Sequence, residues 1–386
     1  MNQTARNETS TNQTATDRLS KAKLWWAQIR SVIRLEMRKT FFARRGLWIY
    51  ILALLPLLLF IAHSVLTSHE RAATRRLAQK SERRLTYADL LAIKNGMTGP
   101  EVVARLGKPP VYMQWKEQRL DDSQKLVDVN REEYRYSDGS ENLFLFLTDG
   151  EVSSVQLGQG DSVAEDSIVF ASVFQFFYLR LAIFFGCLGI FMNLFRGEVL
   201  DKSLHFYFLA PIRREVLMVG KFLAGLLATC TIFVTSELLQ LVVFSWQFPP
   251  NVRDLYLYQN HGLAHAAAYL GVTVLACLGY GAFFLAAGML FRNPILPAAA
   301  ILVWEAVNPF LPALLKKFSV IYYLKSLCPV DIPSPPGTSP VMSLLISNPD
   351  PVSAPVAILG IVIVSMLVLY VSSFQARRME INYTTE

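Results

Sequence analysis

Three ionisable residues interrupt long apolar stretches of this chain, and they are the first candidates for chemistry. Arg180, Glu237 and Glu305 each lie within a run of apolar residues long enough to cross a membrane. A charge at that depth is costly unless it is paired or hydrated, so such residues line a pathway or lock helices together. Arg180 and Glu305 lie near the middle of their runs, and we hypothesise that they pair, within one subunit or across two. A pathway role and a helix-packing role stay open for all three.

A second candidate is the segment of residues 196–217, which lies between two of the apolar runs. Charged residues begin and end this segment, and aromatic residues occupy its centre. An apolar centre with a charged rim is typical of a protein-docking surface, because the centre supplies binding energy and the rim sets the register. The alternative is a half-helix lying among lipid headgroups. The residues expected to dock are Glu198, Asp201, Leu204, His205, Phe206, Tyr207, Phe208, Pro211, Arg213 and Arg214.

The elements that must hold these residues are six apolar runs. Each is long enough to cross a hydrocarbon core of roughly 30 Å as a helix, which takes about twenty apolar residues. In lipid only helices and closed barrels satisfy their backbone groups, and these runs lack the alternation of a barrel strand. The sequence therefore predicts an all-α polytopic membrane protein. The predicted transmembrane helices are residues 47–68, 168–195, 219–246, 264–291, 295–315 and 356–374.

The distribution of Lys and Arg predicts the orientation of the helices. With the N-terminus inside, the inner-face segments carry sixteen Lys and Arg residues and the short outer connections carry four. Because basic residues concentrate in cytoplasmic loops, both termini are predicted to be cytoplasmic. The insert of residues 67–167 has fourteen basic and seventeen acidic residues, so the positive net charge of the chain, +7, comes entirely from outside the insert. The basic charge thus belongs to membrane loops, and no nucleic-acid partner is expected.

The N-terminal region is predicted to have two parts. Residues 1–20 are rich in Asn, Thr, Gln and Ser and should form a disordered cytoplasmic tail. Residues 21–46 should form an amphipathic interfacial helix on the inner membrane surface, with Trp25 on its apolar side and Arg34 on its polar side. Glu36 falls among the apolar positions, where lipid would penalise it. We therefore expect that side of the helix to contact protein for part of its length.

The insert after the first apolar run has the pattern of a small α+β domain outside the cytoplasm. Residues 69–84 are highly charged and predict a solvated helical stalk. Residues 85–160 predict two helices ending at glycines, followed by four strands with Asp-Gly turns. The predicted helices are 87–95 and 99–106, the predicted strands are 111–115, 133–136, 143–147 and 152–157, and the turns are Asp138-Gly139 and Asp149-Gly150.

Two stretches of the membrane region resemble a known family. The sequence GEVLDKSLHFYFLAPIRREVLMVGK at 197–221, with RLEMRKTFFARRGLWIYILALLP at 34–56, is similar to permease subunits of type-2 ABC exporters. The resemblance implies six spans and a coupling helix between the second and third, covering Glu198 to Arg214. It also implies that Glu36, Arg38 and Lys39 lie near an ATPase surface. The expected partners are two ABC ATPase subunits, which would bind ATP and Mg²⁺, a second permease subunit, and membrane lipid.

The insert resembles a different family. The stretches IKNGMTGPEVVARLGKPP at 93–110, EEYRYSDG at 132–139 and LFLFLTDGEVSSVQ at 143–156 are similar to the BamE/SmpA domain of outer-membrane assembly lipoproteins. Domains of this type are protein-interaction modules without known chemistry, so the resemblance implies a periplasmic partner for residues 85–160. The alternative is a passive spacer. In the exporter family the link between the first two spans is usually short, so the insert is a departure from the pattern.

The chain contains no motif for binding a triphosphate by itself. It has no G-x-x-x-x-G-K-[ST], no G-x-G-x-x-G on a strand–helix turn and no H-E-x-x-H. No catalytic residue, cofactor or metal site is therefore expected in this chain. The sequence favours a permease subunit in a bacterial inner membrane, with residues 69–167 in the periplasm. The alternatives are a membrane-anchored scaffold whose insert binds an envelope partner, and an ion-coupled carrier that uses Arg180, Glu237 and Glu305.

Overall fold

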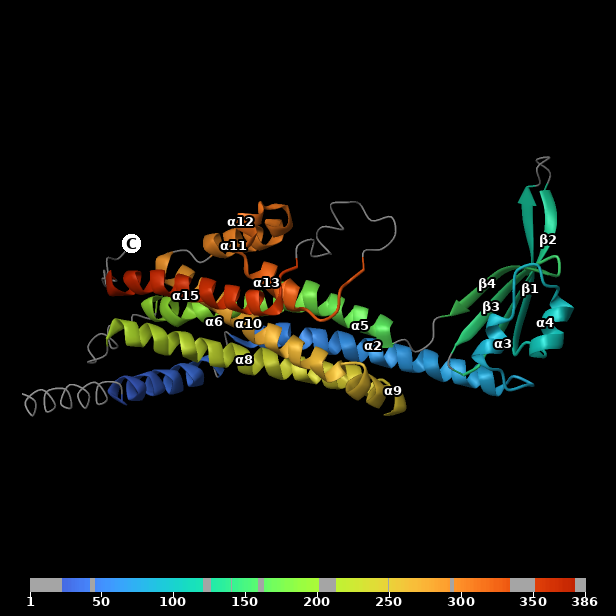
Figure 1. Ribbon diagram of the computed structural model, residues 1–386, viewed down its shortest axis with the longest axis horizontal. Coiled ribbons are helices and arrows are strands. Elements are labelled where there is room, and N and C mark those ends of the chain that lie inside the picture. The colour runs from blue at the N-terminus through green and yellow to red at the C-terminus, as the bar shows by residue number, and fades with distance from the viewer. Residues whose placement is uncertain are drawn as a thin grey trace, which may run out of the picture. The chain divides into compact units, whose positions relative to one another are not determined.

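The computed structural model of the chain divides into two compact units, and each is described by itself (Figure 1). The helix-rich unit comprises residues 1–59, 167–243 and 254–386, and the sheet unit comprises 60–166 with 244–253. The structure describes residues 23–41, 46–120, 126–139, 141–158, 163–200, 213–248, 250–291, 295–333 and 351–378.

Within these described residues, five helices are long and apolar enough to cross a membrane, so the chain is a multi-pass membrane protein. The second of them is continuous but changes its winding, from α-helix to π-helix and back. The five are α2 (Leu47–Gln79); α5 (Val163–Ser172), η2 (Val173–Ile183) and α6 (Phe184–Leu200) together; α8 (Arg214–Trp246); α10 (Gly262–Leu290); and α15 (Ala354–Arg378). Two short helical turns, α9 (Pro250–Asp254) and η3 (Leu255–Gln259), lie between α8 and α10.

Small residues bring the long helices close together. Helix α10 packs against both α6 and α15. A Cβ on Gly281 of α10 would lie 2.5 Å from the ring of Phe191, and a Cβ on Gly225 of α8 would lie 2.7 Å from the same ring. Only glycine allows backbones to approach an aromatic ring this closely, which is the packing typical of membrane helices.

The fifth apolar run does not form a continuous helix of membrane length, so the prediction of one over 295–315 is wrong. Helix α11 (Ile295–Val307) has 13 residues and is about 20 Å long, against a core of roughly 30 Å. It ends before Pro309, which lacks a backbone N–H and disfavours helical geometry in the residue before it. The chain continues through η4 (Asn308–Phe310), α12 (Ala313–Lys316) and α13 (Val320–Leu327). Helix α13 packs against α10 and α15 and is buried along much of its length.

The sheet unit contains two short helices and a four-stranded antiparallel meander, as the sequence predicts. The strand order is β1-β2-β3-β4, and the burial of β3 alternates along its length. The first helix ends at Leu91, four residues before its predicted end, and the first two strands are longer than predicted. The elements are α3 (Tyr87–Leu91), α4 (Gly99–Leu106), β1 (Val111–Leu120), β2 (Leu126–Ser137), β3 (Asn142–Thr148) and β4 (Glu151–Gly158).

The core of the sheet unit lies between one face of the meander and the two helices. Leu90, Val102 and Leu106 from the helices are buried together with Tyr136 and Leu145 from the strands. The predicted turns are present, with φ of 100° at Gly139 and 88° at Gly150, values that glycine adopts without strain. The predicted stalk is helical over residues 69–79, where α2 continues to Gln79, but residues 80–84 are not helical.

Candidate functional site

The interfacial helix, residues 23–41, is joined to α8 by a buried ion pair. Lys221 Nζ lies 2.6 Å from Glu36 Oε1, and the two residues are 0% and 3% exposed. Lys221 also donates to the backbone oxygen of Leu194 on α6 at 2.8 Å, and its ammonium group lies 5.3 Å from the centre of the Phe195 ring. One cation therefore connects three helices. The expectation that the Glu36 side of this helix contacts protein is confirmed.

Two further contacts hold the interfacial helix on α8. A Cβ on Gly220 would lie 3.0 Å from Val32, which is itself 3% exposed, so the helices are nearly in backbone contact there. The guanidinium carbon of Arg213 lies 5.3 Å from the centre of the Trp25 ring, within range of a cation–π interaction. These contacts surround the Glu36–Lys221 pair, and we call this region the inner junction.

The inner junction lies at the two helix ends that flank the predicted coupling segment. Helix α6 ends at Leu200, so Glu198 is in its last turn, and Arg214 is the first residue of α8. Arg38 and Lys39 lie on the exposed side of the interfacial helix. The other predicted docking residues, Asp201, Leu204, His205, Phe206, Tyr207, Phe208 and Pro211, lie outside the described residues, as do 1–20.

Sequence reasoning missed Lys221 as a member of this site. It is a single cation at the start of the apolar part of α8, directly after Gly220. Glu36 is the single acid on the apolar side of the interfacial helix. Two isolated charges of opposite sign, each on an otherwise apolar face, are the signal that predicts such a pair, since each is costly to bury alone.

Arg180 and Glu305 do not form the direct ion pair that we hypothesised within one subunit. Both oxygens of Glu305 accept hydrogen bonds at the start of α13: Oε2 from Ser319 Oγ at 2.8 Å and from Ile321 N at 2.9 Å, and Oε1 from Val320 N at 3.0 Å. A carboxylate is well placed at a helix N-terminus, where unpaired N–H groups and the helix dipole favour negative charge. Glu305 therefore ties α11 to α13 in this structure.

Arg180 occupies a different setting at the C-terminal end of the π-helical segment η2. Its guanidinium carbon lies 5.5 Å from the centre of the Phe176 ring, and its buried Nε has no hydrogen-bond partner among the described residues. It interacts electrostatically with Tyr280 and Glu305 at longer range. A π-helical stretch inside a longer helix is frequently found at a functional site.

Glu237 on α8 is a buried ionisable residue of the helix-rich unit. It is 0% exposed, and neither of its carboxylate oxygens has a hydrogen-bond partner among the described residues. It is close enough to Tyr178 and Tyr269 for electrostatic interaction. The hydroxyl of Tyr269 and that of Thr273, one turn further along α10, are also buried and have no hydrogen-bond partner in the part of the chain that the structure describes. A lone buried carboxylate is far costlier than a protonated one, so this group is suited to binding a proton or another cation.

The comparisons add no relative to this description. No protein family, no curated protein and no solved structure matches the chain. Within the residues that the structure describes, no three His, Cys, Asp or Glu side chains are arranged to hold a metal ion. The geometry of the inner junction and of the buried carboxylates is therefore the basis of the functional argument.

Proposed function

We propose that this chain is the transmembrane permease subunit of an ATP-driven, ABC-2 type exporter. In this proposal two separate ATPase subunits bind below residues 196–217, and a second permease subunit completes the substrate path. In this proposal the chain crosses the membrane six times, the fifth time through the short segment of α11 and η4 where the other five crossings use full-length helices, and both termini are cytoplasmic. Residues 69–167 then face the periplasm of a bacterial cell.

The observation that carries the proposal is the Glu36–Lys221 pair of the inner junction. When an ATPase subunit changes conformation, its motion reaches the membrane helices only through contacts that are rigid. A fully buried charged hydrogen bond of 2.6 Å, surrounded by helix–helix contact at Gly220, is such a contact. Because Lys221 also donates a hydrogen bond to the backbone oxygen of Leu194, a displacement of the interfacial helix moves α6 and α8 together.

The positions of the charges on the interfacial helix support the same proposal. Glu36 is turned towards α8, whereas Arg38 and Lys39 are on the exposed side of that helix. The exposed Arg38 is then available to an acidic surface of a partner, while the buried Glu36–Lys221 pair holds the opposite side of the helix on α8. Charges at the rim of an interface mainly affect association rate and salt dependence, so this contact should weaken at high ionic strength.

The proposal is tested by purifying the chain together with any ATPase subunit that is bound to it. The tagged chain would be purified from its native membrane in a mild detergent, and bound proteins identified by mass spectrometry. We expect a subunit containing a phosphate-binding loop, and its loss in Phe206→Asp and Phe208→Asp. Tyr258→Asp is the matched control, because Tyr258 is 74% exposed and lies far along the chain from residues 196–217. An active chain that has no nucleotide-hydrolysing partner refutes the proposal.

The Glu237 environment favours a second candidate, an ion-coupled carrier. A buried carboxylate without a hydrogen-bond partner is the feature expected of a proton or cation site in a membrane carrier. The two candidates differ in their energy source. Transport by reconstituted protein that follows a proton gradient in the absence of ATP, and that is lost in Glu237→Gln, favours the carrier over the exporter.

A further inference from the structure

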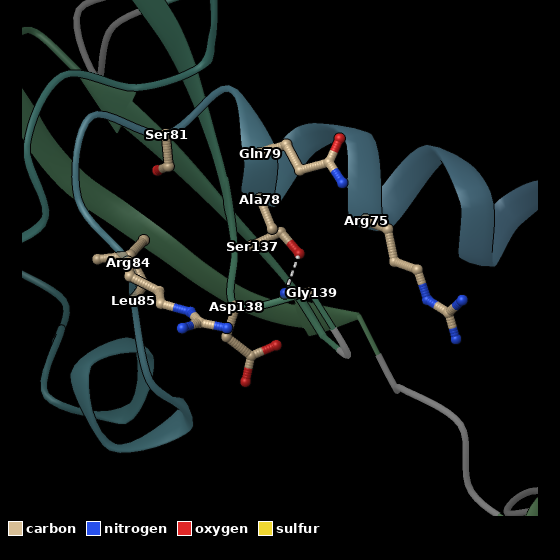
Figure 2. A pocket seen from close by; sticks show the side chains of 9 residues that line it. All are labelled: Arg75, Ala78, Gln79, Ser81, Arg84, Leu85, Ser137, Asp138 and Gly139. Carbon is tan, nitrogen blue, oxygen red and sulfur yellow. Dashed lines mark hydrogen bonds between the residues drawn. The ribbon is translucent and has the colours of Figure 1, made fainter. Parts of the chain in front are cut away.

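The end of α2 and the turn between β2 and β3 line a pocket of about 350 Å³ in the sheet unit that is open to solvent, and we call it the stalk pocket. Figure 2 shows the side chains that surround it. Arg75 and Gln79 come from α2, Ser81 and Arg84 from the segment that follows, and Asp138 from the β2–β3 turn. The BamE-like resemblance implies a protein partner for this unit but assigns no small-molecule site to it.

The walls of the stalk pocket are held by specific contacts. Asn142 Nδ2 donates to Thr74 Oγ1 at 2.8 Å, which joins β3 to α2. Gly139 has a φ of 100°, and a Cβ there would lie 3.7 Å from the Cβ of Ala78, so the turn lies directly against α2. The Gly139 amide donates to Ser137 Oγ at 3.0 Å, a bond drawn in Figure 2. The pocket is therefore formed by elements that are fixed to each other.

The lining of the stalk pocket is positively charged. Arg75 and Arg84 form no hydrogen bond or ion pair with any described residue. Asp138, the one acid in the lining, already accepts the Glu141 amide at 2.7 Å through its Oδ1. Two guanidinium groups and one carboxylate leave a net charge of +1.

The charge is concentrated here in the sequence as well. Residues 69–84 contain six Lys and Arg residues and two acidic residues, whereas residues 85–167 contain eight basic and fifteen acidic residues. An anion approaching the insert is therefore attracted to the end of the stalk and repelled by the rest of the sheet unit.

One residue that lines the same pocket has a hydroxyl group without a hydrogen-bond partner among the described residues. The Oγ atom of Ser81 is buried and has no hydrogen-bond partner among the described residues. A buried polar group without a partner costs about 1–3 kcal/mol, and a ligand that supplies an acceptor atom removes that cost. Ser81 lines the pocket together with Arg75 and Arg84, whose side chains are exposed to solvent.

We propose that the stalk pocket binds a phosphate group carried on a small polar headgroup. Guanidinium groups bind phosphate through paired charge-assisted hydrogen bonds, and the tetrahedral oxygens of phosphate suit donors that do not share a plane. The net charge of +1 matches the single negative charge of a phosphodiester. A volume of 350 Å³ is at the small end of ligand sites and leaves room for a glycerol or sugar unit beside the phosphate.

This site goes beyond the proposed export function and does not depend on it. It would make the insert a ligand-binding unit in addition to a partner-binding one. A lipid headgroup and a free phosphate ester supply the same phosphate chemistry, and the choice of probe distinguishes these two sources.

The experiment uses the full-length chain in a maltoside detergent, which contains no phosphate, and needs no ATPase. Calorimetric titrations would compare inorganic phosphate, glycerol 3-phosphate, dihexanoyl phosphatidylglycerol and acetate. We expect the phosphate compounds to bind and acetate to bind at least about tenfold more weakly. A preference for the dihexanoyl lipid assigns the site to a headgroup, and equal binding of glycerol 3-phosphate assigns it to a free ester.

A matched pair of double variants tests the location. Arg75→Gln with Arg84→Gln should weaken phosphate binding by about tenfold or more, since two charged hydrogen-bond donors are lost. Arg76→Gln with Arg83→Gln removes the same charge from adjacent positions that do not line the pocket, and should change binding by less than about twofold. Equal weakening in both double variants overturns the proposal, as does equal binding of acetate or the absence of binding by every phosphate probe.

Discussion

Replacing Lys221 by methionine tests whether the inner junction is the rigid contact that the proposed mechanism requires. Methionine keeps the length and apolar stem of lysine but removes the charge, so Glu36 is left buried without its cation. Removing one partner of a buried ion pair costs about 3–5 kcal/mol, whereas losing an exposed pair costs about 0.2–1 kcal/mol. The exposures of 0% and 3% place this pair in the first class.

The second half of this prediction is a double-mutant cycle. Glu36→Leu with Lys221→Met replaces both charges with apolar side chains, and such replacements of buried pairs are commonly neutral or stabilising. We therefore expect the double variant to recover most of the stability that Lys221→Met loses. Arg38→Met is the control, because Arg38 is on the exposed side of the same helix and should change stability by no more than about 0.5 kcal/mol.

The assay is equilibrium unfolding of the full chain in mixed micelles of increasing sodium dodecyl sulfate content, followed by tryptophan fluorescence. Trp25 and Trp26 lie on the interfacial helix and should report its release from α8. The reasoning is refuted if Lys221→Met costs about 1 kcal/mol or less. It is also refuted if the double variant equals the sum of its single variants within about 0.5 kcal/mol, because the two side chains would then be uncoupled.

Three further predictions concern other parts of the chain. Hydrogen bonds from the Thr86 hydroxyl and amide lower the pKa of Asp89, so the ionised carboxylate stabilises the fold above its ordinary pKa of about 4, and this stabilisation is lost as the pH falls through the lowered value. Thermal unfolding of a 69–160 fragment between pH 6 and pH 2 should show this loss of stability. The Asp89→Asn variant should show a smaller dependence of stability on pH. Gly281→Ala should destabilise the chain by about 1–3 kcal/mol because its Cβ meets the buried Phe191 ring, whereas Gly271→Ala on the same helix has nothing within 4 Å and should not. Dicyclohexylcarbodiimide, which modifies protonated carboxyl groups in apolar surroundings, should label Glu237 in preference to Glu305, as peptide mass spectrometry would detect.

The sheet unit was predictable because its signals are local. Each Asp-Gly pair requires a backbone conformation that suits a tight turn, and β3 alternates between buried and less buried residues. The misplaced end of α3 has a tertiary cause: the Gly96 amide donates to Val152 O and the Val152 amide to Met97 O, both at 2.8 Å. Residues 96 and 97 therefore pair with β4, which is incompatible with continuing the helix to residue 95.

The length of β1 was not predictable from its sequence for a different reason. Its residues from Tyr112 to Gln118 are exposed, so neither face is selected to be apolar and no alternation appears. The strand is specified instead by its pairing with β2, which runs from Val111 with Arg135 to Leu120 with Leu126. The length of β1 is therefore set by contacts with residues elsewhere in the sequence, and the sequence of β1 alone does not predict it.

In the helix-rich unit, the sequence identified the costly residues but not their partners. Glu36 and Glu305 were singled out because lipid penalises a charge, and both are buried in contact with protein. The partner of Glu36 is 185 positions away in the chain, and the partners of Glu305 are mainly backbone amides, which no residue type signals. An ion pair between Arg180 and Glu305 was the simplest solution by charge alone, and the N-terminus of α13 is the solution found.

The three carboxylates that are buried among the described residues of the helix-rich unit differ in a way that bears on which contacts can change during a transport cycle. Glu36 has a cation at 2.6 Å, and Glu305 accepts three hydrogen bonds from α13. Moving either group away from its partners leaves a buried charge uncompensated, so both resist rearrangement. Glu237 accepts no hydrogen bond from the described residues, and a conformation that brings it to water or to a cation lowers its free energy. The contacts of Glu237 with its neighbours Tyr178 and Tyr269 are therefore the ones that we expect to open first, while the inner junction moves as one body.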